Sequence, residues 1–108
     1  MKFPPECLGT AQLASFIATF TEQADDLLFN MELDVMMIRR MTRVIADYSS
    51  PGNALECARQ AQRRVIKTMA HLEQIAMWLL DTTLDRYYRL VTQWVVENLA
   101  FEKAADRL

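Results

Sequence analysis

The chain has 108 residues, of which 52% are hydrophobic, and it contains only two glycines and three prolines. This composition excludes a disordered or loop-rich protein and suits a single domain, residues 1–108, with a modest core. The 12 basic and 14 acidic residues give a formal net charge of −2. A charge this small exerts no general attraction on nucleic acid or on an anionic membrane.

Residues 1–9 are expected to form an extended lead-in, because Pro4 and Pro5 cannot join a helix interior and Gly9 precedes the first periodic segment. The start of the chain lacks the apolar run of a signal peptide. No stretch approaches ~18 uncharged apolar residues, which is the length that a membrane span needs. We therefore expect a cytoplasmic protein without a membrane span.

The two cysteines, Cys7 and Cys57, lie far apart and are not accompanied by histidines at metal-binding spacing. They match neither a disulfide framework nor a zinc site. We predict two reduced thiols, no metal and no other cofactor.

The segment from residue 11 to residue 48 contains no glycine or proline, and its apolar residues recur at steps of three and four. This spacing predicts one helix of about 36 residues and ~55 Å. A break near Asn30 is the alternative, because asparagine is tolerated at helix ends. The expected core stripe comprises Leu13, Ile17, Phe20, Ala24, Leu27, Leu28, Met31, Val35, Ile38 and Ile45.

Residues 49–53, Ser-Ser-Pro-Gly-Asn, are the strong turn signal inside the chain. Asn53 and Glu56 have the spacing of a capping box, so a second helical run is expected to begin there. We favour a break in this run at residues 81–83, where Thr82 and Asp85 form another capping pair. Its expected core stripe comprises Ala58, Ala61, Val65, Met69, Leu72, Ala76, Leu79, Leu84, Tyr87, Tyr88, Val91 and Val95. The predicted fold is all-α, either a helical hairpin or an antiparallel bundle of three or four helices.

The most informative feature is a surplus of apolar residues outside these stripes. In the first run, four such residues lie about 120–180° from the stripe: Phe29, Leu33, Met36 and Met37. In the second run, Trp78 lies about 140° from the stripe. Either both faces of these helices are buried within the bundle, or the surplus residues form an interface. On the second interpretation the chain forms a homo-oligomer, most simply a symmetric dimer, or binds another protein. The predicted partner-binding residues are Phe29, Leu33, Met36, Met37, Trp78 and Trp94.

Residues for catalysis are few, since His71 is the one histidine and the chain has no phosphate-binding loop or hydrolase motif. Arg64 and His71 are separated by six residues, a spacing that resembles the R-x4-6-H signature of HEPN-type ribonucleases, which are small helical bundles often found in toxin systems. The resemblance implies an arginine and a histidine on one helix face that act together on an RNA phosphate. The alternative is an arginine and a histidine at the solvent edge of the core stripe.

Arg59, Arg63 and Lys67 follow one another at four-residue steps, as in a stripe that neutralises phosphates. Such a stripe is more often a solvated helix face, and no DNA- or RNA-reading motif accompanies it. The sequence therefore favours a non-enzymatic protein–protein interaction module: an adaptor, regulator, inhibitor or small chaperone. A nucleic-acid-directed protein, either a HEPN-like ribonuclease or a binder, is the second hypothesis.

Overall fold

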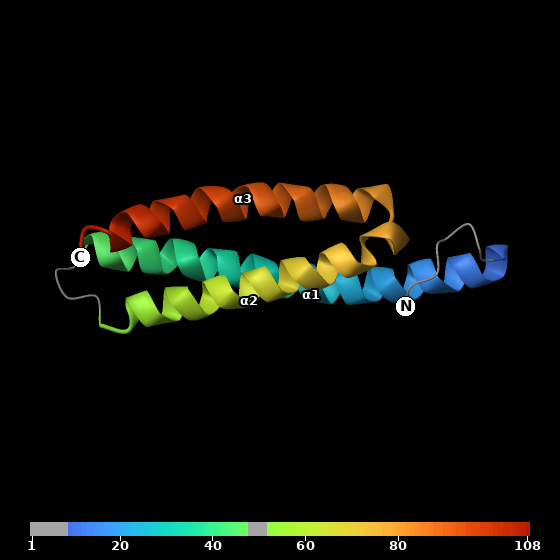
Figure 1. Cartoon of the computed structure of the whole chain (residues 1–108), viewed down its shortest axis with the longest axis horizontal. Coiled ribbons are helices and arrows are strands. Elements are labelled where there is room, and N and C mark those ends of the chain that lie inside the picture. The colour runs from blue at the N-terminus through green and yellow to red at the C-terminus, as the bar shows by residue number, and fades with distance from the viewer. Residues whose placement is uncertain (1–8, 48–51) are drawn as a thin grey trace.

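The computed structural model describes residues 9–47 and 52–108 and shows an antiparallel bundle of three long helices (Figure 1). Helix α1 spans Thr10–Asp47, α2 spans Ala54–Ile75 and α3 spans Asp81–Ala105. A single 3-10 turn, η2, at Ala76–Trp78 joins α2 to α3. The described ranges contain no strand, and the predicted all-α bundle is confirmed with three helices.

Helix α1 is one uninterrupted helix of 38 residues. With no glycine or proline to end it, the helix continues through Asn30, so the alternative of a break at that residue is wrong. At 1.5 Å per residue its length is about 57 Å, which accounts for most of the 60 Å long axis of the molecule.

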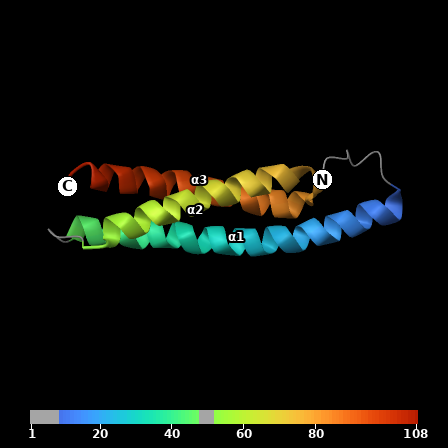
Figure 2. The same ribbon diagram turned by 60° about the horizontal axis from the view of Figure 1, so that its bottom comes forward.

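Helix α1 is also the centre of the bundle, because α2 and α3 both pack against it much more than against each other (Figures 1 and 2). Its buried residues are Ala24, Leu28, Met31, Val35, Ile38 and Ile45, as the predicted stripe requires. The first turns of α1 extend past the η2 end of the hairpin (Figure 1).

The two partner helices meet α1 with side chains of different size. Helix α2 buries small residues in its first half, among them Ala58 and Ala61. Helix α3 buries large aromatic ones, Tyr87, Trp94 and Phe101. Small and large side chains thus fill the two sides of one core, as dense packing requires.

The helix ends differ from those expected. Asn53 precedes α2, but its side chain forms no capping hydrogen bond, and Gly52 makes the turn with φ +59°. The second break lies before Thr82, because Leu79 and Leu80 are extended and α3 begins at Asp81 without a side-chain cap. The predicted capping pairs are therefore wrong. The expected lead-in up to residue 8, including Cys7, and the part of the turn at residues 49–51 lie outside the described residues.

Tyr87 links α3 to α2. The side chain is buried, and its hydroxyl donates a hydrogen bond of 2.8 Å to Oε1 of Glu73 at the edge of the core. Burial, and then the hydrogen bond and the charge of Glu73, raise the pKa of the Tyr87 hydroxyl well above its ordinary value. The neutral phenol is therefore the form that the folded state stabilises.

Replacing Tyr87 with phenylalanine should lower the free energy of unfolding by about 1 kcal/mol at pH 7, because this hydrogen bond is lost. The pKa of Tyr87 is higher in the folded state than in the unfolded chain. Its contribution is thus fully present below about pH 10, the ordinary tyrosine pKa, and is lost as the pH rises above that value. Urea unfolding of both proteins between pH 7 and pH 11 measures this. Parallel pH dependences above pH 10 would contradict the assignment.

Candidate functional site

The side of α1 opposite its buried stripe carries three large apolar side chains, of which Leu33 also lines a hollow beside α2. Phe29, Leu33 and Met36 are between 48% and 57% exposed, and we call them the α1 outer face. The fourth predicted residue of this segment, Met37, is half-buried and packs against the core. Three of the four are therefore accessible in the monomer.

The two predicted tryptophans lie in the core. Trp78 is 2% exposed, and its ring centroid is 5.2 Å from that of Phe16 and 5.7 Å from that of Phe20. Trp94 is 9% exposed, on the side of α3 that faces α1. Trp78 would point away from the core if α2 continued beyond residue 75. The helix ends there, and the 3-10 turn that follows places the Trp78 ring against α1. Neither side chain is accessible to a partner.

Helix α3 carries a second exposed apolar surface that the sequence did not identify. Tyr88, Val95, Val96 and Leu99 are between 47% and 65% exposed, and we call them the α3 outer face. With the exposed Thr92, residues 88, 92, 95 and 99 follow steps of four, three and four, the spacing of one helical stripe.

The predicted core stripe of α3 included Tyr88 and Val95, and this part of the prediction is wrong. The buried face comprises Thr83, Tyr87, Leu90, Trp94 and Phe101. Both faces of the helix are apolar, and periodicity alone contains no information on which of them meets α1. The larger size of Trp94 and Phe101 was the available signal, because large aromatic side chains dominate core burial.

The two outer faces lie on different sides of the molecule. The α1 outer face points away from the α2–α3 hairpin, whereas the α3 outer face is nearly opposite the side of α3 that packs on α1. One of them can therefore be covered without blocking the other.

The basic stripe on α2 is largely neutralised by carboxylates. Arg59 forms an ion pair with Glu102 of α3, and its guanidinium lies 4.9 Å from the centre of the Phe101 ring. Nη2 of Arg63 lies 3.2 Å from Oε1 of Glu56. Two of the three cations thus already have partners, which weakens the attraction of this face for phosphates.

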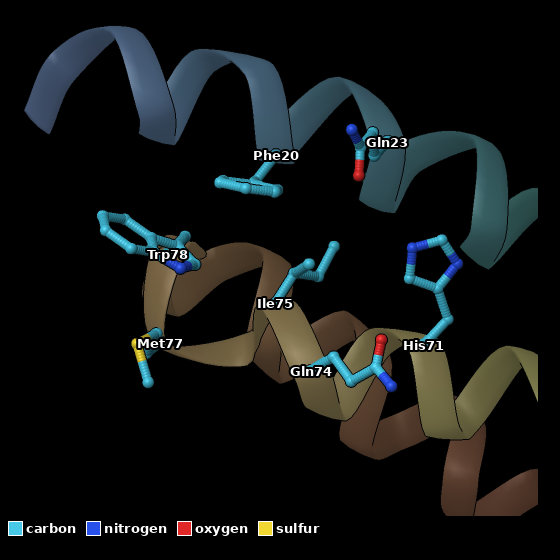
Figure 3. A pocket seen from close by; sticks show the side chains of 7 residues that line it. All are labelled: Phe20, Gln23, His71, Gln74, Ile75, Met77 and Trp78. Atoms are coloured by element: carbon cyan, nitrogen blue, oxygen red, sulfur yellow. The ribbon is translucent and has the colours of Figure 1, made fainter. Parts of the chain in front are cut away.

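Arg64 and His71 line separate hollows. Nε of Arg64 donates a hydrogen bond of 2.9 Å to Oδ1 of Asp34, beside a hollow of about 330 Å³. His71 lines a different hollow, of about 610 Å³, and faces Gln23 of α1 across it (Figure 3). Both side chains are exposed on α2, but they line different hollows, and the resemblance to HEPN-type ribonucleases stays a prediction.

The larger hollow, between α1 and the end of α2, has an aromatic end formed by Phe20 and Trp78 (Figure 3). Gln23, His71 and Gln74 supply its neutral polar groups. Within the described ranges, no three His, Cys, Asp or Glu side chains gather as metal ligands. Over the same residues, none of the helices has the length and apolar character needed to cross a membrane.

The chain matches no protein-family model, no curated protein and no solved structure.

Proposed function

We propose that this protein is a non-enzymatic adaptor that binds other protein chains through the apolar outer faces of α1 and α3. The proposal rests on one observation: the side chains of these two faces are not part of the packed core. On the two faces, seven large apolar residues at helical spacing are between 47% and 65% exposed. Scattered exposed apolar residues are ordinary, but contiguous patches of them mark interaction surfaces.

The α3 outer face suits a partner helix with an apolar stripe of its own. Steps of four, three and four let a second helix lie along Tyr88, Thr92, Val95 and Leu99 over about three turns. Lys103 lies beyond the end of this stripe and forms no ion pair with any described residue. We infer that the partner helix presents acidic side chains at this end.

The binding energy at this face comes from apolar burial. Covering one half-exposed valine or leucine contributes about 1 kcal/mol, half of what full burial gives. Four such side chains support an association of moderate strength, which suits a reversible adaptor.

The test is affinity purification of the tagged full chain from its native cells, with the retained proteins quantified by mass spectrometry. The wild-type chain should retain a partner in near-equal amount. The double variant Val96→Asp and Leu99→Asp should lose at least 90% of it, because aspartates would be buried in an apolar contact. Gln93→Asp, exposed on another side of α3, is the matched control and should retain it.

Equal retention by the double variant and the control would contradict the proposal for this face. The identified partner is then purified, and its binding to the wild-type chain and to the double variant is measured. This comparison distinguishes direct from indirect retention. Circular dichroism of each variant verifies that the fold is intact.

A further inference from the structure

The α1 outer face continues into charged residues of opposite sign at its two ends. Glu22 and Asp26 precede Phe29 on the same side of the helix, and Arg40 and Arg43 follow Met36. All seven positions, from residue 22 to residue 43, follow alternating steps of four and three. Along α1 these residues are first acidic, then apolar, then basic, and we call them the outer line. Their period of 3.5 residues makes the line wind slowly around the helix, by about 20° per heptad.

These four charged side chains are exposed, and none forms an ion pair with a described residue. Their neighbours toward α2 and α3 differ in this respect. Asp25 pairs with Arg86, Asp34 with Arg64 and Arg39 with Glu97. Three charges at the edges of α1 are thus paired with α2 or α3, whereas the four on the outer line have no such partner, and neither has Glu32, which lies beside Arg86 and Arg89 of α3.

The outer line is complementary to itself when one copy is turned end to end. A two-fold axis beside Leu33 places the leucines of two copies together and Phe29 near Met36 of the second copy. The same rotation brings Glu22 and Asp26 opposite Arg43 and Arg40 of that copy, at both ends of the contact. A parallel arrangement instead places acid against acid and base against base.

We propose that the occupant of the α1 outer face is a second copy of this chain, with its α1 antiparallel and the two-fold axis at Leu33. The contact is isologous, so it produces a dimer and no larger assembly. Each copy keeps its α3 outer face free, and the dimer can therefore bind two partner chains at once. The proposal rests on the proposed function, of which it names one partner.

The affinity expected for this dimer is modest. The segment from residue 22 to residue 43 is about 33 Å long, and three apolar side chains per copy form its centre. Such a contact is at the small end of stable interfaces, and its charged ends are exposed. We expect a dissociation constant in the micromolar range that increases with salt.

The test uses two double variants of the full chain. Glu22→Arg with Asp26→Arg makes both ends of the line basic, and Arg40→Glu with Arg43→Glu makes both ends acidic. Each variant alone should self-associate at least 100-fold more weakly than the wild-type chain, because like charges then meet at both ends. Mixed in equal amounts, they should form a heterodimer as strong as the wild-type dimer. Native mass spectrometry, with one variant labelled with ¹⁵N, separates heterodimer from homodimer.

The double variants also test the orientation, because in a parallel contact like charges already meet in the wild-type chain and neither double variant would weaken that contact further. The chain that carries all four substitutions is the control for the substitutions themselves. It should self-associate like the wild-type chain, because exchanging both ends restores opposite charges across the antiparallel contact. A wild-type dimer whose affinity none of these substitutions changes would overturn the proposal and place the contact on another face, α3 being the candidate.

A wild-type chain that stays monomeric would also overturn it. If that monomer still retains a partner that the α3 variant loses, the proposed function stands and the second copy alone is wrong. If no partner is retained either, both are wrong.

Discussion

Replacing Trp78 with alanine is expected to lower the free energy of unfolding by about 3–5 kcal/mol, the cost of truncating a large buried aromatic side chain. The ring is almost fully buried and contacts the rings of Phe16 and Phe20, which attach the η2 end of the hairpin to α1. Since typical domains of this size are stable by only 5–15 kcal/mol, the variant should unfold at much lower urea concentration. Urea titration followed by circular dichroism measures the difference.

Met77→Ala is the matched control, because Met77 is adjacent to Trp78 in η2 but is exposed. It should change the free energy of unfolding by no more than about 0.5 kcal/mol. A Trp78→Ala variant that is as stable as Met77→Ala would show that the aromatic cluster does not hold the hairpin end, and Trp78 would again be a candidate contact residue.

Replacing Leu33 with aspartate is expected to weaken self-association at least 100-fold without loss of stability. Leu33 is half-exposed in the monomer, so the substitution removes little from the core. In the dimer the new carboxylates of the two copies would meet at the two-fold axis, where each is unpaired and partly desolvated. Asn30→Asp, exposed on the same helix but outside the outer line, should leave the affinity nearly unchanged.

Sedimentation equilibrium over a range of protein concentrations measures this affinity, and urea unfolding measures the stability of the same samples. A Leu33→Asp chain that loses its helicity would mean that Leu33 is required for the core. A folded variant that dimerises as the wild-type chain does would exclude the α1 outer face as the contact.

The sequence predicted the fold well where one period continues without interruption. The stripe of α1 keeps its three-and-four spacing from Leu13 to Ile45, so the long helix and its buried side followed directly. The stripe of α2 was equally clear from Ala58 to Leu72. In both helices the apolar side is narrow enough for the pattern alone to identify it.

The periodicity of apolar residues no longer predicts which side chains are buried at the turn between α2 and α3. The turn η2 and the extended Leu79 and Leu80 interrupt the helical period at residues 76–80. Trp78 and Trp94, both predicted to bind a partner, are buried. Helix α3 is apolar on two sides, and only packing against α1 determines which one is buried.

The residues of the outer line can be seen in the sequence, but only the structure shows that they form one exposed surface. The spacing of Phe29, Leu33 and Met36 identifies them as surplus apolar residues, whereas nothing in the sequence distinguishes Glu22 and Asp26 from an ordinary solvated helix surface. Their meaning depends on two facts that periodicity does not contain. Asp25 and Asp34 form ion pairs with the other helices at the surface of the bundle, and the apolar side chains on this side of α1 are left exposed.

The wild-type chain in the sedimentation experiment tests whether the α1 outer face binds a second copy of this chain. We expect a mass that rises from one chain to two chains across the micromolar range and stops there, with a midpoint that moves to higher concentration as salt is added. A mass of one chain at every concentration and at low salt would contradict this expectation, and so would a mass that continues to rise beyond two chains.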